Sequence, residues 1–129
     1  MNTSHPVPVL GITMGDPAGI GPEILIKALA DPKLATICTP VVIGDKAVLE
    51  KAVRLLNAPI TFNSIDQINQ IDHSDKIRQG LENRVYLIPV SDLDPDVTDL
   101  KTPTPDTGTS MENYILKGIG IGAPNGNYY

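Results

Sequence analysis

Apolar and polar positions follow two different periods along the chain, which predicts strands separated by helices. The apolar run Val7–Met14 has the length and composition of a buried strand. The segment Pro22–Ala30 places its apolar residues on one side of a helix, and Lys46–Leu56 has a broader apolar face. Three shorter apolar runs predict further strands, at 40–43, 59–62 and 85–90. Strands spaced by helices in this way are typical of an α/β fold with a mostly parallel sheet and flanking helices.

Cap and turn residues indicate where these helices begin and end. Gly21 is the expected N-cap of the first helix, with Pro22 at the first helical position, where its missing N–H costs nothing. We expect this helix to close at Asp31, because the residue before a proline disfavours the helical region. Asp45 is the expected N-cap of the second helix, and Asn57 suits its C-terminus. The apolar face of the second helix is expected to comprise Val48, Leu49, Ala52, Val53, Leu55 and Leu56.

The second half of the chain carries a weaker pattern. Residues 63–84 are mostly polar, although three isoleucines within them have helical spacing. Residues 91–105 combine aspartates, prolines and threonines, which is typical of a loop. A last helix is expected to begin near Asp106 or Thr107 and to end near Lys117.

Glycine dominates the end of the chain. Gly118, Gly120 and Gly122 alternate with isoleucine, and each costs about 1 kcal/mol relative to alanine inside a helix. We therefore expect the last helix not to continue through them. The chain is divided accordingly into residues 1–117, one α/β unit, and residues 118–129, a glycine-rich tail.

The turn between the first strand and the first helix carries the most chemical information. Three glycines and two prolines between residues 15 and 22 predict a tight turn whose backbone closely approaches a neighbour. The adjoining helix N-terminus presents N–H groups and a partial positive charge, which suit an anion. Asp16 fits two roles equally well, an Asx-turn within the loop or a hydrogen bond to a ribose hydroxyl or an amide. Glu23 is more simply explained by its favourable position at the helix dipole.

The same turn resembles a family signature. Residues 11–24 read GITMGDPAGIGPEI and look like the N-terminal motif of the 4-hydroxythreonine-4-phosphate dehydrogenase family. Residues 40–45, and residues 105–115 with Gly108, Ser110, Tyr114 and Ile115, agree with that family in order and type. The resemblance implies the first portion of an NAD-dependent dehydrogenase of pyridoxal phosphate biosynthesis, with an incomplete fold like that of isocitrate and isopropylmalate dehydrogenases.

Generic nucleotide motifs do not account for this turn. The dinucleotide fingerprint fails because Ile24 stands where glycine or alanine is required, and no Lys-Ser/Thr pair completes a P-loop. The isocitrate and isopropylmalate dehydrogenases carry a similar turn beside their cofactor cleft. By that likeness, the candidate wall of the NAD site consists of Gly15, Asp16, Gly19, Ile20 and Gly21.

The resemblance also implies chemistry that this chain does not carry. In the family, a divalent metal (zinc, magnesium or cobalt) is held by histidines, and a homodimer oxidises and decarboxylates a small phosphorylated hydroxy acid. The family's catalytic residues and metal ligands lie beyond the point where the resemblance stops, so none is assigned here. His5 and His73 match no family ligand and are interpreted as surface residues. Asp72 and Asp75 flank His73 without a second cluster to complete a metal shell, and four aspartates at 92–99 lack the pattern of a calcium loop.

Composition narrows the class of protein. A net charge of −5 and a pI near 4.8 disfavour nucleic acid as a partner, since phosphate binding requires clustered Lys and Arg. No apolar run approaches the roughly 18 residues of a membrane helix. Cys38 is the single cysteine, which together with the lack of a secretory segment favours the cytoplasm.

Three functional interpretations remain open. The first is an inactive N-terminal fragment of the dehydrogenase, shortened by a frameshift, a premature stop or the choice of its ends. The second is a non-catalytic module that binds a nucleotide or a partner. The third is a dehydrogenase of a related four-carbon substrate, such as phosphothreonate or phosphoerythronate, because nothing in residues 1–117 distinguishes these substrates.

Overall fold

The computed structural model describes residues 7–71, 83–95 and 102–122 of the chain. A single sheet of four strands lies at its centre, in the order β1-β2-β4-β3. All three strand pairings are parallel, which confirms the predicted parallel sheet. The strands are β1 (Val9–Thr13), β2 (Thr39–Asp45), β3 (Thr61–Ser64) and β4 (Arg84–Ser91).

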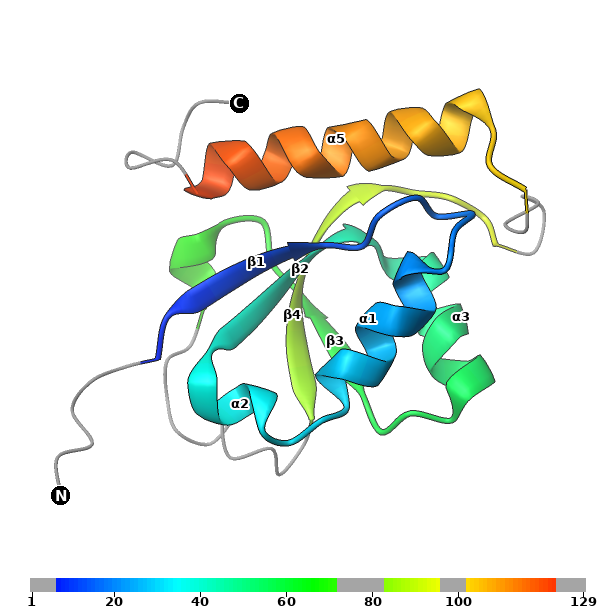
Figure 1. Ribbon diagram of the computed structural model, residues 1–129. Helices are drawn as coiled ribbons and strands as arrows, with labels where there is room; N and C mark the ends of the chain where they lie inside the picture. Colours follow the sequence, from blue (N-terminus) through cyan, green and yellow to red (C-terminus); the bar gives the residue numbers. More distant parts are fainter. Residues whose placement is uncertain (1–6, 72–82, 96–101, 123–129) are drawn as a thin grey trace, which may run out of the picture.

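Helices cover both sides of this sheet (Figure 1). Helices α1 (Gly21–Leu29) and α3 (Lys46–Leu56) pack against each other on one side. The long helix α5 (Pro105–Gly122) crosses the other side and contacts β1, β2 and β4. The short helix α2 (Leu34–Ile37) and a 3₁₀ turn, η1 (Ile68–Gln70), complete the described elements. This arrangement is an α/β fold with flanking helices.

The two central strands form the core. Strand β2 is buried along almost its whole length, and Val85 to Ile88 of β4 are buried beside it. Continuous apolar runs are expected in strands that are covered on both faces, and this is where the sequence pattern is most informative. Strand β3 is displaced from its prediction: it lies at Thr61–Ser64, two residues beyond the expected 59–62.

The helix caps show which local rules hold. Asp45 caps α3 by accepting a hydrogen bond from the Val48 N–H at 3.1 Å, and Asn57 adopts the left-handed conformation after it (φ 50°); both predictions are confirmed. Gly21 is the first helical residue of α1, and Ile20 is the N-cap, so the cap was predicted one residue late. Leu55 was expected on the buried face of α3 but is 68% exposed.

The predicted end of the last helix is wrong. Helix α5 does not stop near Lys117 but continues through Gly118 and Gly120 to Gly122. A Cβ on Gly118 would lie 3.4 Å from Ile43 Cδ1, so this glycine lies against the sheet, and Gly120 is buried. Packing against the sheet thus outweighs the unfavourable helix propensity of these residues.

Several predicted features lie outside the described residues. They include His5, His73, the flanking aspartates 72 and 75, the aspartates at 96 and 99, and residues 123–129. Within the described ranges, no helix is long and apolar enough to cross a membrane.

Candidate functional site

The turn after β1 is held tightly against the end of β2. The Met14 N–H donates a hydrogen bond to the Ile43 carbonyl at 3.1 Å, and the Asp45 N–H points at the Met14 sulfur at 3.2 Å. Gly15 follows with φ +77°, a conformation that side chains disfavour. A Cβ on Gly21 would overlap the Met14 carbonyl oxygen. The close backbone approach that the glycines predict is therefore present, and its neighbour is the turn's own backbone.

Asp16 folds the turn back on itself. Its Oδ1 accepts a hydrogen bond from the Ala18 N–H at 2.8 Å, and its carbonyl accepts one from the Gly19 N–H at 2.9 Å. The Asx-turn expected as one of its two roles is thus observed. Asp16 remains partly exposed, so a ligand contact by the carboxylate stays a prediction.

The first turn of α1 follows directly and faces outward. Its N-cap, Ile20, is 72% exposed and provides no side-chain cap. Pro22 lies in the first turn and carries no N–H, and Glu23 is exposed there, as expected from the helix dipole. Gly19 and Ile20 are exposed beside the helix N-terminus, where the Ile20 carbonyl accepts a hydrogen bond from the Ile24 N–H at 3.1 Å.

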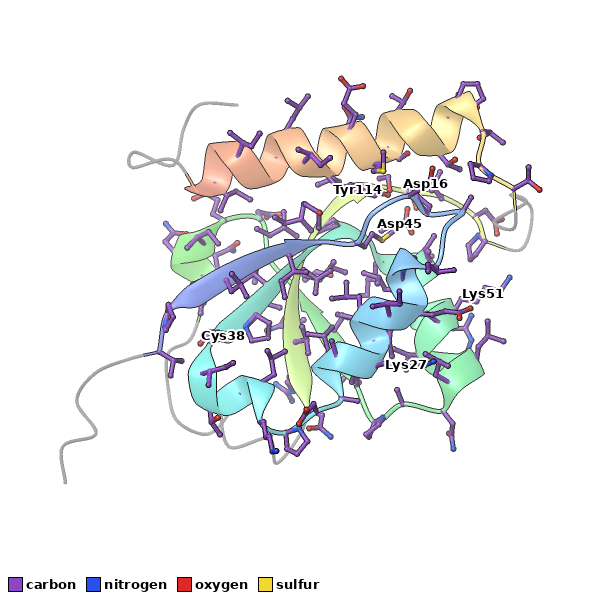
Figure 2. The ribbon with its side chains drawn as sticks, in the orientation of Figure 1. Asp16, Lys27, Cys38, Asp45, Lys51 and Tyr114 are labelled. Atoms are coloured by element: carbon purple, nitrogen blue, oxygen red, sulfur yellow. The ribbon has the colours of Figure 1, made fainter. Side chains whose placement is uncertain are left out.

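Asp45 is the centre of a buried polar network at the ends of β2 and β4. Its side chain is 1% exposed, and besides capping α3 it accepts hydrogen bonds at Oδ2 from the Ser91 hydroxyl (2.8 Å) and the Leu93 N–H (2.6 Å). Ser91 Oγ and Tyr114 Oη lie 2.5 Å apart in a further hydrogen bond. Figure 2 shows Tyr114, Asp45 and Asp16 gathered where α5 crosses the strand ends. The network thereby fixes α3 and α5 to the same edge of the sheet.

Burial and charge raise the pKa of Tyr114 above its ordinary value. Desolvation is the largest cause, and the negative charges of Asp45 and Asp16 act in the same direction, while hydrogen bonds with Ser91 and Ser110 oppose it. The pKa of Cys38 is raised as well, by burial alone. Tyr114 therefore remains a neutral hydroxyl, and Cys38 lacks the lowered pKa of a reactive thiol.

The structure thus brings together the carboxyl ends of three strands, where ligands bind in open α/β sheets. Gly15, Asp16, Gly19, Ile20 and Gly21 form one continuous turn there, after β1. The sequence pattern predicts Asp45 only as a helix cap, and its link to Ser91 and Tyr114 was not predicted. One usable signal was present: Asp45 and Ser91 are the last residues of two buried strands, and the carboxyl ends of parallel strands share one edge of a sheet.

A metal site does not form within the described ranges. Among these residues, no three His, Cys, Asp or Glu side chains come close enough together to hold an ion. Asp45 is occupied by three hydrogen-bond donors. The described residues therefore do not fit the divalent metal that the resemblance implies.

Known proteins resemble this chain over most of its length. A 4-hydroxythreonine-4-phosphate dehydrogenase from Desulforapulum autotrophicum is 40% identical over 114 residues, covering 88% of this chain and 32% of that protein. A Clostridium botulinum protein with the proposed name D-threonate 4-phosphate dehydrogenase is 31% identical over 87% of this chain and 31% of its own length. No family model matches the chain.

Solved structures of 4-hydroxythreonine-4-phosphate dehydrogenases also resemble this chain over most of its length. The crystal structure of a 4-hydroxythreonine-4-phosphate dehydrogenase from Burkholderia phymatum superposes with a TM-score of 0.76 at 28% identity, over 89% of this chain and 32% of that one. The Klebsiella pneumoniae enzyme of the same name gives 0.75 at 25% identity, over 94% and 35%. The chain spans about a third of the length of these relatives. The resemblance of the glycine turn is thereby confirmed: the chain is related, over most of its length, to one portion of the 4-hydroxythreonine-4-phosphate dehydrogenases.

Proposed function

We propose that this chain is the N-terminal portion of an NAD-dependent dehydrogenase that oxidises 4-phosphooxy-threonine in pyridoxal phosphate biosynthesis. The observation that carries the proposal is the 40% identity to the Desulforapulum autotrophicum enzyme over 88% of the chain. The parallel sheet and the glycine turn agree with it. A cytoplasmic location and a homodimeric parent enzyme belong to the same proposal.

The turn after β1 contributes one wall of the NAD site. Gly15, Asp16, Gly19, Ile20 and Gly21 are proposed to contact the cofactor. Three features support this assignment: the exposure of Gly19 and Ile20, the helix N-terminus of α1 and the position at the carboxyl end of β1. The second oxygen of the Asp16 carboxylate is proposed as an acceptor for a ribose hydroxyl.

The chain alone is proposed to be inactive. In the complete reaction, the substrate's secondary alcohol loses a hydride to NAD and a proton to solvent, and the resulting ketone loses carbon dioxide. A divalent metal would supply Lewis-acid polarisation of the developing carbonyl in the complete enzyme, but the described residues of this chain would not hold it. The resemblance implies that the family's metal ligands and catalytic residues lie outside this portion, and the chain spans only about a third of the length of its relatives.

A related substrate is the second candidate. The Clostridium botulinum relative is named for D-threonate 4-phosphate and is 31% identical to this chain. Its level of similarity is close to that of the 33% identical 4-hydroxythreonine-4-phosphate dehydrogenase from Trichlorobacter lovleyi. This portion of the fold therefore does not separate the two substrates.

Calorimetric titration with NAD tests the cofactor wall. We expect the chain to bind NAD and Asp16→Ala to abolish the binding. Asp31→Ala is the matched control, because Asp31 accepts the same kind of hydrogen bond from the Lys33 N–H at an exposed site away from the turn. Absence of NAD binding by the unmodified chain, or equal binding by Asp16→Ala, contradicts the assignment.

NADH formation tests catalysis. Absorbance is followed with 4-phosphooxy-threonine and with threonate 4-phosphate, using the Desulforapulum autotrophicum enzyme as a positive control. No turnover is expected from this chain with either substrate. NAD binding without turnover is compatible both with a portion of the enzyme and with a non-catalytic nucleotide-binding remnant, and turnover by the chain alone contradicts the proposed inactivity.

A further inference from the structure

Met14 connects the end of β1 to the glycine turn at residues 15–21, and it is only 1% exposed. Its N–H donates a hydrogen bond to the Ile43 carbonyl at 3.1 Å. Its carbonyl oxygen lies against Gly21, where a Cβ would overlap it. The main chain of Met14 therefore contacts both the end of β2 and the far end of the turn. Its side chain has no part in the cofactor wall proposed above.

The Met14 sulfur replaces a backbone acceptor at the end of β2. In a parallel pair, alternate residues of a strand direct their N–H and C=O groups to the same neighbour. The Ile43 carbonyl bonds to Met14, so the Asp45 N–H, two residues later, points to the same side, where β1 has already ended at Thr13. The sulfur lies 3.2 Å from the Asp45 nitrogen and accepts its hydrogen. A thioether is a weak acceptor, but it keeps this buried N–H from being unpaired.

Gly44 gives the thioether the room that it needs. A Cβ on Gly44 would lie 2.5 Å from Met14 Sδ and 2.7 Å from Met14 Cγ, so a side chain there would displace the sulfur from the Asp45 N–H. A Cβ on Gly11, a glycine of β1, would lie 3.6 Å from Ile43 Cδ1, which is an ordinary contact. The close approach at Gly44 is therefore specific to the place of the Met14 side chain.

The Met14 sulfur also adjoins the buried polar network. The residue whose N–H bonds to the sulfur, Asp45, accepts a hydrogen bond from the Ser91 hydroxyl through its carboxylate. Ser91 shares a further hydrogen bond with Tyr114 of α5. Figure 2 shows Tyr114 and Asp45 close together where α5 crosses the strand ends. Direct contacts thus run from α5 through Asp45 to Met14 and the turn.

We infer that Met14 is a positioning residue, whose thioether fixes the turn at residues 15–21 relative to the Asp45 network and thereby holds the cofactor wall in place. The sulfur acts through Gly15, the next residue, whose φ of +77° other side chains disfavour. The effect on the cofactor rests on the proposed NAD site. The placement of the turn itself does not.

Replacement of the sulfur atom alone tests this role. Norleucine has a CH₂ group in place of the sulfur and accepts no hydrogen bond, whereas selenomethionine retains an acceptor. Both are incorporated into Met111→Leu, so that Met14 is the one methionine among the described residues. With norleucine, the Asp45 amide proton resonance should move upfield, and the Ala18 and Gly19 N–H groups should exchange about threefold faster. NAD affinity should fall by a similar factor, and selenomethionine should restore all three values.

The Ile65 amide separates positioning from general stability. Its N–H donates to the Leu87 carbonyl at 2.8 Å, next to β3 at the far edge of the sheet. A general loss of stability speeds exchange at Ile65 and in the turn alike, whereas a loss of position speeds exchange at Ala18 and Gly19 alone. Gly44→Ala should have the same selective effect, and Gly11→Ala is its matched control.

Several results would overturn the inference. Unchanged turn amides with norleucine exclude a positioning role, and equal acceleration at Ile65 assigns Met14 to general stability. Faster exchange in the turn with unchanged NAD affinity excludes an effect on the cofactor wall. If the unmodified chain binds no NAD, the proposed cofactor site is contradicted, and exchange at Ala18 and Gly19 still decides whether Met14 positions the turn. The norleucine chain decides the matter even if Gly44→Ala fails to fold.

Discussion

Replacing Asp45 by asparagine should destabilise the protein although it changes only one side-chain atom. The Asp45 carboxylate accepts from the Val48 N–H at Oδ1 and from the Leu93 N–H at Oδ2, and it is almost fully buried. An amide has one carbonyl oxygen and one NH₂ group. In either orientation, the NH₂ group faces one of these two main-chain donors, which loses its acceptor.

The expected magnitude follows from that loss. A buried donor without an acceptor costs about 1–3 kcal/mol. The Ser91 hydroxyl limits the damage because it can reverse its hydrogen bond and accept from the new NH₂ group. A chain of this length changes its melting temperature by about 4 °C per kcal/mol, so Asp45→Asn should melt roughly 4–12 °C lower.

Urea and thermal unfolding followed by circular dichroism measure this effect. Asp31→Asn is the control, because the Asp31 side chain accepts from a main-chain N–H at 2.9 Å in an exposed turn. Its cost should remain below about 0.5 kcal/mol, as for most surface substitutions. Equal unfolding free energies of the two variants would refute the assignment of Asp45 as the centre of a buried network.

Three further predictions concern packing and ionisation. Gly21→Ala should cost about 1–3 kcal/mol of unfolding free energy, because the new Cβ would overlap the Met14 carbonyl. Gly19→Ala should cost less, because its Cβ would lie 3.4 Å from the nearest atom. A larger loss for Gly19→Ala than for Gly21→Ala in urea unfolding contradicts the packing argument. Gly118→Ala should raise the free energy of unfolding by up to about 1 kcal/mol, because alanine favours the helix and its Cβ would make near-ordinary contacts with the sheet. A lower melting temperature of this variant contradicts the prediction. The raised pKa of Tyr114 means that the unfolded chain ionises first, so stability should be complete below about pH 10 and fall as the pH rises further. Tyr114→Phe should cost about 0.5–1.5 kcal/mol at neutral pH, because it removes the hydrogen bond with Ser91. The same variant should reduce the loss of stability at alkaline pH. If stability falls with pH as steeply as in the unmodified chain, the alkaline loss does not come from Tyr114.

The elements that the sequence predicted best are those determined by local chemistry. Asp45 and Asn57 mark the ends of α3 because a capping carboxylate and a left-handed asparagine act within a few residues of the chain. The buried strands β2 and β4 were predicted because both faces are covered and their apolar runs are uninterrupted. The glycine turn after β1 was identified for the same reason, since its conformational requirement is local.

The prediction of where α5 ends is wrong because contacts with distant parts of the chain determine the length of this helix. Gly118 and Gly120 argue for a helix end when only propensity is considered. In the structure, Gly118 lies against Ile43 and Thr13, and Ile121 packs against the core. Packing of α5 on the sheet thus stabilises a helix that propensity alone would end, and no pattern within residues 105–122 reveals this packing.

The polar network at the strand ends illustrates the same limit for function. Asp45, Ser91 and Tyr114 were each visible in the sequence, as a cap, a loop residue and part of a resemblance. Their proximity depends on β2 and β4 being neighbours, although β3 lies between them in the chain. The bond between Ser91 and Asp45 spans 46 residues, and its existence follows from a crossover that sheet packing selects. Local patterns therefore identify which residues lie at the carboxyl edge of the sheet, whereas the order of the strands determines which of them meet.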